Sequence, residues 1–484
     1  MTGWLLAPVL VPLTAAALAA LGRRSQLLQR GLAVASVAVV VAAGAALLTA
    51  TTTGRIPVTA LGGWPNRFAI VFAADPLAAL LVTTTGVVAL AVLGAAVGTA
   101  EDGHPFFHPL VLVFIAGVCG SFLTADLFNL FVFFEVALTA SYVLATLAAT
   151  RRQVRAGAVY IATNLAGSLL LVTGVAWTYA AAGTVNLADF AGGAGRLPAV
   201  AGAVLLVAFG VKAAAFPLGG WLAVTYPDLP RSIAALFGGL LTTVGVVALY
   251  RILALALHAR LRTPLLAVAT ATIVVGALAA LGRRAPDEIL AFQVIAQVGF
   301  MILGAGLFGP AGLAAGVFFV VQDMVVKTAA FLSLGGARDV TGHDAGATLE
   351  RARPVLAFAF FLVVLSFAGL PPTSGFVGKL LLIRAAFAGA QYAVAALALV
   401  GSLATLAALL RAWRITFTAP RQEAPEPSTG PGPRRMRIAG AAPAATLAVL
   451  ALAVGMFPAG LAEHAQRSAA WLVAPDRYAA AVLE

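Results

Sequence analysis

The sequence GVKAAAFPLGGW, at residues 210–221, places a lysine inside an apolar run that begins near Ala199. A lysine in membrane hydrocarbon costs about 2.5–3.5 kcal/mol on insertion scales, so Lys212 needs a partner or a function there. Pro217 and Gly219 follow closely, and the proline removes a backbone donor and interrupts the helix just after the charge. The stretch therefore predicts a broken membrane helix with a buried amine at the break, and it suggests an ion path.

The composition of the whole chain predicts an all-α polytopic membrane protein. The 484 residues are 62% hydrophobic and 10% charged, with a mean hydropathy of +1.01. Apolar segments of about 20 residues recur from end to end and indicate about fourteen transmembrane helices. Residues 3–21 are interpreted as the first of these because they lack a basic n-region and a cleavage site typical of a signal peptide.

Several function classes find no support in the sequence. The net charge is +12, but no basic run alternates with aromatic residues, which argues against nucleic-acid binding. The single cysteine, Cys119, excludes an intrachain disulfide and a cysteine-ligated iron–sulfur cluster. The chain has no P-loop and no soluble nucleotide-binding fold, and we expect neither a cofactor nor a metal site.

The three lysines are the sharpest compositional signal. Of 30 basic residues, only Lys212, Lys327 and Lys379 are lysines, and all three lie in apolar surroundings. Arginine keeps its proton in proteins, whereas a desolvated lysine can release it. A preference for arginine explains the loops but not where the lysines remain. The distribution therefore suggests amines that exchange protons.

Two further spans carry buried charges. Glu135 lies near the middle of the fifth predicted span, residues 127–149, where an intramembrane carboxylate is expected to face a partner, and Lys212 is the predicted partner. In the eleventh span, Asp323 precedes Lys327 by four residues, which is the favourable orientation for an ion pair on one helix face. This pair is either functional or a structural pair that only neutralises itself.

A second break mirrors the first. The twelfth predicted span, residues 354–383, contains GLPPTSGFVGK, so that Lys379 also lies beside a proline-disrupted segment. The two interrupted spans are five helices apart and would run in opposite directions, which indicates inverted repeats. The predicted organisation comprises helices 1–3 at 1–107, a first five-helix repeat (helices 4–8) at 108–256, a second, inverted repeat (helices 9–13) at 264–413, a cytoplasmic linker at 414–437, and helix 14 with a tail at 438–484.

Polar residues between these charges could hold water or only join helices. They are Thr242, Thr243, Gln293, Gln297 and Gln322, with Ser141, Tyr142, Asn164 and Ser168 equally ambiguous. An even number of spans puts both termini on one side. The opposite side carries the larger share of the arginines, so the positive-inside rule predicts a plasma-membrane protein with both termini outside.

Three stretches resemble the antiporter-like subunits shared by respiratory complex I, membrane hydrogenases and Mrp-type multisubunit cation/proton antiporters. FNLFVFFEVALTASYVL resembles the glutamate helix of that family, GVKAAAFPLGGWL its broken lysine helix, and GLPPTSGFVGKLLL its second broken helix. The segments near Gly62 and Gly183 are most similar to the D-type subunits of the Mrp antiporters. The likeness extends over roughly residues 60–460, in the family's order and spacing.

The resemblance implies roles for individual residues. Glu135 and Lys212 match the coupled acid–base pair of the family, Lys327 its lysine after two histidines, and Lys379 the ionisable residue of the second broken helix. The chain also departs from the pattern. Thr243 stands where related subunits have a lysine, and Gln322 and Asp323 stand where the histidines usually are. The family's lysine and histidines at these positions would form the central part of a proton relay. Either Thr243 with water and the Asp323–Lys327 pair replace them here, or proton conduction is altered.

The favoured function is a proton-conducting subunit of a multisubunit monovalent cation (Na⁺)/H⁺ antiporter, working in a hetero-oligomer with other integral membrane subunits. One alternative is a proton-pumping membrane-arm subunit of a respiratory NADH:quinone oxidoreductase or a membrane hydrogenase, which is the form an enzyme assignment would take. Another is a non-conducting structural subunit. A chain that itself handles nicotinamide or quinone has the least support, since no nucleotide or cluster motif is present.

Overall fold

The computed structural model describes residues 2–64, 69–191, 197–257, 261–338, 353–418 and 441–483. Most of the predicted linker, residues 419–437, lies outside the described residues. The N-terminal elements are α1 (Thr2–Leu21), α2 (Gln26–Thr51), an antiparallel hairpin of β1 (Val58–Ala60) and β2 (Val71–Ala73) joined through a short 3₁₀ turn (Leu61–Gly63), and α3 (Pro76–Ala96).

The middle of the chain contains two successive groups of helices. The first group is α4 (Phe107–Leu123), α5 (Leu127–Ala145), α6 (Arg151–Ala182), the short α7 (Leu187–Ala191), α8 (Ala199–Ala213), α9 (Gly220–Thr225), a 3₁₀ turn (Tyr226–Asp228), α10 (Arg231–Ile252) and a π-helical turn (Leu253–Leu257). The second group is α11 (Arg262–Leu281), α12 (Pro286–Gly306), α13 (Pro310–Arg338), α15 (Pro354–Ala368), α16 (Ser374–Ala388), α17 (Tyr392–Trp413) and a π-helical turn (Arg414–Thr418). That these groups are inverted repeats stays a prediction.

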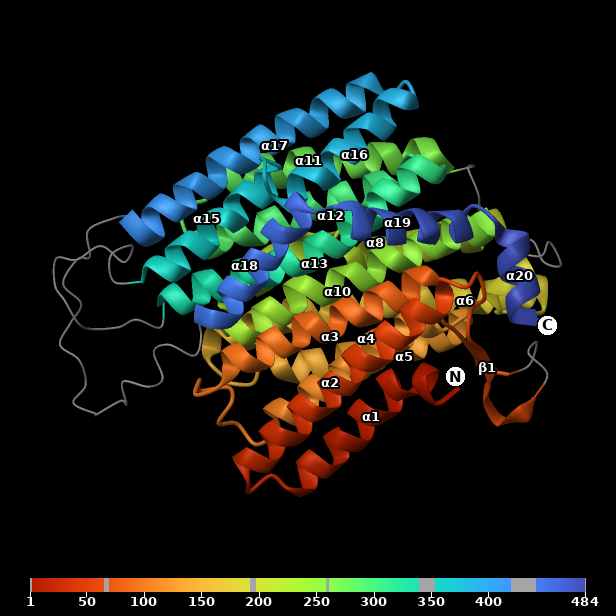
Figure 1. Cartoon of the computed structure of the whole chain (residues 1–484), viewed down its shortest axis with the longest axis horizontal. Coiled ribbons are helices and arrows are strands. Elements are labelled where there is room, and N and C mark those ends of the chain that lie inside the picture. The colour runs from red at the N-terminus through yellow and green to blue at the C-terminus, as the bar shows by residue number, and fades with distance from the viewer. Residues whose placement is uncertain are drawn as a thin grey trace.

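The predicted polytopic membrane fold is confirmed. Ten helices in the described ranges are long and apolar enough to cross a membrane, and a bent helix pair counts as an eleventh. Three more predicted spans correspond to the shorter apolar helices α4, α8 and α15. Helices suit this environment because they satisfy their backbone hydrogen bonds internally, where no water is available to do so. Figure 1 shows both ends of the chain at the same end of the bundle.

The C-terminal region differs from the single helix expected at residues 438–462. α18 (Ala441–Met456) is followed by Phe457 and Pro458, and α19 (Ala459–Leu472) then begins at 79° to α18. α20 (Pro475–Leu483) completes the described chain. A proline cannot continue the hydrogen-bond ladder of a helix, which accounts for the elbow. The segment predicted as a tail is therefore largely helical, and it continues along the bundle to the end that carries both termini (Figure 1).

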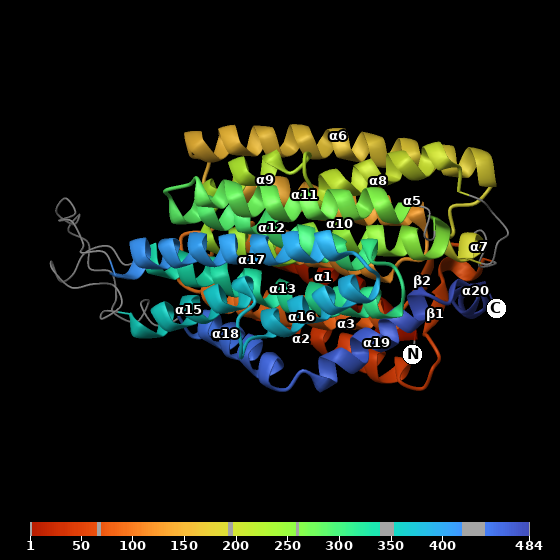
Figure 2. The ribbon, with the colours of Figure 1, turned by 90° about the horizontal axis from the view of Figure 1, so that it is seen from above.

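The core is built around α10, α12 and α13, whose residues are almost all buried. Figure 2 shows these helices inside the bundle, with α6 along one edge and α18 and α19 along the opposite edge. A helix that is apolar on every face is expected to be enclosed by others. α13 packs against α10, α12, α15, α16, α18 and α19. Polar residues on these three helices are therefore held away from both lipid and bulk water.

Both predicted interruptions are present. α8 ends at Ala213, with Ala214 in a left-handed conformation, and α9 begins at Gly220. α15 ends at Ala368, with Gly369 in a left-handed conformation, and α16 begins at Ser374. Each break also contains one cis X–Pro peptide bond, Phe216–Pro217 and Pro371–Pro372. The prediction of two discontinuous helices is confirmed, and the elbow between α18 and α19 is a third bend that was not predicted from the sequence.

Candidate functional site

Lys212 lies in the last turn of α8, and its side chain is only 1% exposed. Its Nζ atom donates hydrogen bonds to the Asn164 carbonyl oxygen at 2.9 Å and to Ser168 Oγ at 2.5 Å, both on α6. Nζ also lies 3.9 Å from Glu135 Oε1 on α5. The predicted pairing of Lys212 with Glu135 is confirmed as an ion pair, but it is not a direct hydrogen bond.

Ser168 joins the two charges. Its hydroxyl accepts from Lys212 and forms a short hydrogen bond to Glu135 Oε1. A hydroxyl can accept and donate at once, so Ser168 is suited to pass a proton between an amine and a carboxylate. The Glu135 side chain is 28% exposed, whereas that of Lys212 is buried. The carboxylate is therefore the member of this group that reaches the outside of the chain.

The backbone groups freed by the first break find partners. Trp221 Nε1 on α9 donates to the Val211 carbonyl oxygen at 3.0 Å, and the Phe216 amide donates to Thr272 Oγ1 on α11 at 3.0 Å. An unpaired backbone group would be costly at this depth. The break is thus stabilised by the Trp221 indole of α9 and by the Thr272 hydroxyl of α11, which belongs to the second helix group.

α10 connects the two halves of the site. A Cβ at Gly245 would lie 2.6 Å from the Ala213 nitrogen, and one at Gly239 would lie 3.0 Å from the Met324 carbonyl oxygen. Glycine at these positions lets α10 contact the end of α8 with one turn and α13 with another, about 9 Å apart along the helix. Thr242 and Thr243 lie between these two contacts.

The two threonines differ. Thr243 Oγ1 donates to the Gly239 carbonyl oxygen at 3.0 Å, which uses its proton within its own helix. Thr242 Oγ1 is buried and has no hydrogen-bond partner among the described residues. The unpaired hydroxyl therefore belongs to Thr242, and not to Thr243, which the sequence favours.

Asp323 and Lys327 form the predicted i,i+4 pair on α13. Lys327 Nζ lies 2.7 Å from Asp323 Oδ2, and both side chains are at most 1% exposed. The contact is close, although the ammonium is not directed at the carboxylate with good hydrogen-bond geometry. Breaking a buried pair of this kind by removing one member leaves an uncompensated charge.

Several buried polar atoms of α13 and of α12, which packs against it, have no hydrogen-bond partner among the described residues. They are Asp323 Oδ1, both side-chain polar atoms of Gln293, and Gln297 Nε2. Gln322 is different, because its Oε1 accepts from Ser374 at the start of α16 at 3.3 Å. Buried polar atoms without protein partners are normally satisfied by water in native proteins. Such a concentration at mid-span marks a region suited to hydration.

Lys379 lies on α16 just after the second break. Its Nζ atom donates to the Phe367 carbonyl oxygen at 2.6 Å and to Ser402 Oγ on α17 at 3.0 Å. The ammonium also lies 4.1 Å from the centre of the Phe300 ring, a cation–π contact. No carboxylate forms an ion pair with Lys379 within the described part of the chain.

Lys212 and Lys379, the lysines beside the two helix breaks, are stabilised in the same way. Lys212 belongs to the last turn of α8, and Lys379 reaches back to the last turn of α15 through the Phe367 carbonyl. The carboxyl end of a helix carries a partial negative charge that favours a cation. Each lysine also donates a hydrogen bond to a serine hydroxyl on a neighbouring helix, Ser168 or Ser402. The two breaks thus hold an ammonium in the membrane interior largely without a direct carboxylate contact.

The sequence does not predict Ser402 or Phe300, and it does not distinguish whether Ser168 holds water or only joins helices. The i,i+4 spacing of Asn164 and Ser168 on α6 was a usable signal, because these residues share a helix face. Nothing in the local sequence around Ser402 or Phe300 distinguishes them from other membrane-helix residues. The structure places the predicted site residues in three separate places. One holds Glu135, Ser168 and Lys212, another holds Asp323 and Lys327, and the third holds Lys379 with Ser402 and Phe300.

Two charged clusters lie outside this series. Arg251 donates to Asp75 Oδ2 at 3.2 Å and to the Phe122 and Thr124 carbonyl oxygens, tying α10 to the start of α3 and the α4–α5 connection. Asp102 lies in the connection between α3 and α4. Burial acts to raise its pKa, but hydrogen bonds from His108, Arg30 and the Gly98 amide hold that pKa well below 3.8. No three His, Cys, Asp or Glu side chains of the described ranges gather as a metal site would require.

Comparisons with known proteins agree with this architecture. The profile described as "NADH:quinone oxidoreductase/Mrp antiporter, TM" matches residues 124–405. The chain is 34% identical over 499 residues to the D subunit of the Na⁺/H⁺ antiporter of Bacillus subtilis (strain 168), covering 100% of both.

Two solved structures share the fold over nearly the whole chain. A chain in the structure of the Mrp complex from Dietzia sp. DQ12-45-1b superposes with a TM-score of 0.92 at 36% identity, covering 100% of both chains. A chain of respiratory complex I from Thermus thermophilus with bound NADH gives a TM-score of 0.82 at 26% identity, covering 98% of this chain and 99% of that one.

Proposed function

This chain belongs to the NADH:quinone oxidoreductase/Mrp antiporter family of membrane proteins, and from that premise we propose that it conducts protons within a multisubunit monovalent cation/proton antiporter. The antiporter assignment draws on the Bacillus subtilis relative and on the Mrp complex, both of which match over the full chain. Its partners are other membrane subunits of such a complex, and sodium is the first cation to test.

The observation that carries the proposal is the Glu135–Ser168–Lys212 group. A carboxylate at the surface of the chain is linked through one hydroxyl to an amine in its interior. This is the arrangement that proton transfer between the two charges requires, because each neighbouring pair lies within hydrogen-bond reach.

From Lys212 the proposed path runs along α10 to α13. The Gly245 contact brings α10 to the end of α8, and the Gly239 contact brings it to Met324 and Thr328 beside Lys327. Thr242, Gln293 and Gln297 offer unpaired polar atoms to water molecules along this route. Thr243 holds the position of the family's usual lysine, but its hydroxyl bonds within α10, so Thr242 with water is proposed to take the place of that lysine. The Asp323–Lys327 pair is proposed to take the place of the usual histidines.

The path ends at Lys379, beside the second break. The proposed cycle begins with Lys212 protonated and stabilised by Glu135. When that pair is weakened, the proton leaves Lys212 along the hydrated route. The resulting change in electrostatic potential acts on the Asp323–Lys327 pair and, through it, on the protonation of Lys379. Each elementary charge that crosses the membrane potential is worth about 2.3 kcal/mol per 100 mV, which is sufficient to couple proton and cation movement.

The protein is proposed to work in the plasma membrane, with both termini outside. The end of α1 and the start of α2 lie at the end of the bundle opposite the termini (Figure 1), and that turn and the first turns of α2 and α6 carry Arg23, Arg24, Arg30, Arg151, Arg152 and Arg155. The positive-inside rule assigns such an arginine-rich end to the cytoplasm. The second candidate is a proton-pumping subunit of a respiratory complex, which the fold likeness to the Thermus thermophilus chain favours. It predicts proton movement that depends on a redox partner and not on sodium.

The deciding experiment uses the whole complex in everted membrane vesicles of a host that lacks its own antiporters. Adding NaCl should dissipate a pre-formed pH gradient, reported by a fluorescent amine. We expect Glu135→Gln and Lys212→Ala to abolish this response. Glu463→Gln is the matched control, because Glu463 forms an exposed i,i+4 pair with Arg467 on α19.

The outcomes separate the candidate functions. Full exchange in Glu135→Gln or Lys212→Ala, with the complex assembled on a native gel, would show that the subunit is structural. The respiratory role would be favoured if the vesicles show no response to NaCl but move protons when a substrate that reduces quinone is supplied.

A further inference from the structure

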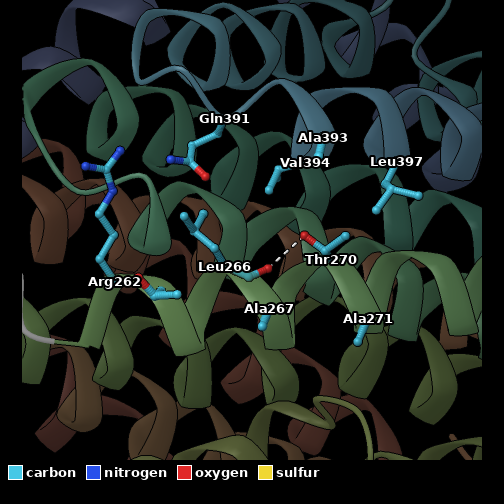
Figure 3. Close-up of a pocket in the computed structure, with 10 residues that line it drawn as sticks. Arg262, Leu266, Ala267, Thr270, Ala271, Gln391, Ala393, Val394 and Leu397 are labelled. Atoms are coloured by element: carbon cyan, nitrogen blue, oxygen red, sulfur yellow. Dashed lines mark hydrogen bonds between the residues drawn. The ribbon is translucent and has the colours of Figure 1, made fainter.

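A groove of about 480 Å³ lies between the amino-terminal halves of α11 and α17. Figure 3 shows the side chains that line it. Its walls are formed by Arg262, Thr263, Leu266, Ala267, Thr270 and Ala271 of α11, and by Gln391, Ala393, Val394 and Leu397 at and after the start of α17.

The groove runs lengthwise between two parallel helices. α11 and α17 lie side by side in the same direction, because Arg411 near the end of α17 donates to the Ala280 carbonyl oxygen near the end of α11 at 3.2 Å. From Arg262 to Ala271 the wall rises about 13 Å, at 1.5 Å per residue. The groove therefore begins at the end of the bundle that carries the termini and extends toward the middle of the spans.

One end of the groove is polar and the rest is not. Arg262 and Gln391 stand at the mouth, where both helices begin. Thr263 adds a hydroxyl in the first turn of α11, next to Arg262. Two turns further along α11, Thr270 adds the second hydroxyl of the lining, and it donates to the Leu266 carbonyl oxygen at 2.7 Å, the dashed line in Figure 3. The deep wall thus presents no free donor and is effectively hydrocarbon.

The Arg262 guanidinium at the mouth of the groove has no anionic partner among the described residues. Arg262 forms no hydrogen bond or ion pair with any residue that the structure describes, and its Nε atom is buried without a partner. A Cβ at Gly389 would lie 2.9 Å from Arg262 Nη2, so the guanidinium rests on the turn between α16 and α17. The Gln391 amide donates to the Gly389 carbonyl oxygen at 3.3 Å on the same turn. The amino end of α11 adds further positive charge.

We propose that this groove binds an anionic phospholipid, with its phosphate at Arg262 and one acyl chain along the wall of α11 and α17. The arginine fork matches phosphate geometry, and the depth at which it lies is that of a lipid headgroup. The flanking surface is also apolar and exposed, with Val268 36% and Leu397 42% accessible, as a lipid-facing surface is. A lipid satisfies the charge and the hydrocarbon wall together.

The test is native mass spectrometry of the purified, delipidated complex titrated with dioleoyl phosphatidylglycerol or with dioleoyl phosphatidylcholine. The wild-type complex should bind phosphatidylglycerol preferentially, and Arg262→Gln should lower that preference about fivefold, the effect of one basic residue at a lipid surface. Ala267→Phe fills the groove and should weaken binding of both lipids. Arg384→Gln is the control, because this exposed arginine on α16 lies outside the lining.

Three results would overturn the proposal. One is an unchanged lipid preference in Arg262→Gln, and another is unchanged lipid binding in Ala267→Phe. The third comes from Ala267→Cys in membranes: cross-linking of residue 267 to another subunit would mean that a protein, not a lipid, covers the groove. None of these readouts depends on exchange activity.

Discussion

Lys212 and Glu135 are separated by 3.9 Å between Nζ and Oε1, and the hydroxyl of Ser168 bonds to both. The three side chains come from three helices, α5, α6 and α8. The exposed carboxylate and the buried amine thus communicate through one side chain. This makes Ser168 the residue whose loss should separate proton transfer from mere charge pairing.

Ser168→Ala should reduce sodium-driven proton exchange about tenfold, because it removes a hydrogen bond to two charged groups. Ser168→Thr keeps a hydroxyl and should retain most of the activity. Exchange rates in everted vesicles, normalised to assembled complex, provide the measurement. If the alanine variant matches the wild type, the hydroxyl is not part of the path.

The Asp323–Lys327 pair should behave as a unit. Asp323→Asn or Lys327→Met alone strands a buried charge and should destabilise the complex by about 3–5 kcal/mol, whereas the double variant should lose much less. Melting temperatures of the solubilised complex measure this directly. Strictly additive losses would argue against a coupled pair. Exchange activity of the double variant then tests whether the pair is needed for conduction.

The elbow between α18 and α19 should support the second break. A Cβ at Gly455 would collide with the backbone of Pro372, Thr373 and Ser374, so α18 ends directly on the segment between α15 and α16. Gly455→Ala should displace this contact and reduce exchange about tenfold, in line with the sensitivity of packed sites to one added methyl. Gly460→Ala is the matched control, because a Cβ there meets nothing within 4 Å. Equal activity of the two variants would contradict a supporting role.

Asp102 should contribute a pH-dependent stability outside the membrane. Its pKa is lowered in the folded protein, so the stabilisation is complete above about pH 4, the unfolded value, and is lost as the pH falls further. The melting temperature of Asp102→Asn should therefore lie below that of the wild type at pH 7, and the gap should narrow below about pH 4. A gap that stays constant with pH would mean that the carboxylate charge is not responsible.

Much of the architecture was predictable because its signals are local. A lysine beside proline and glycine can be read directly at residues 210–221, and both such breaks are present in the structure. The elbow at Pro458 also coincides with a proline, but the apolar run continues on both sides of it, so hydropathy alone predicts one span there. The inverted relation of the two helix groups stays a prediction.

The site was less predictable because its contacts join distant parts of the chain. The pairing of Asp323 with Lys327 follows from helix geometry, and that of Glu135 with Lys212 from the scarcity of buried charges. Ser402 and Phe300 come to Lys379 from other helices, and only the packing of α12, α16 and α17 reveals them. The same holds for Thr242, whose free hydroxyl depends on how Thr243 bonds within α10.

The most direct test of the account is sodium-driven proton exchange by the assembled complex carrying Lys212→Arg. Arginine keeps the positive charge beside Glu135 and Ser168 but does not release its proton. The account predicts that exchange is lost while the complex still assembles. Exchange at the wild-type rate in this variant would contradict it, because it would show that Lys212 serves as a fixed charge and not as a proton carrier.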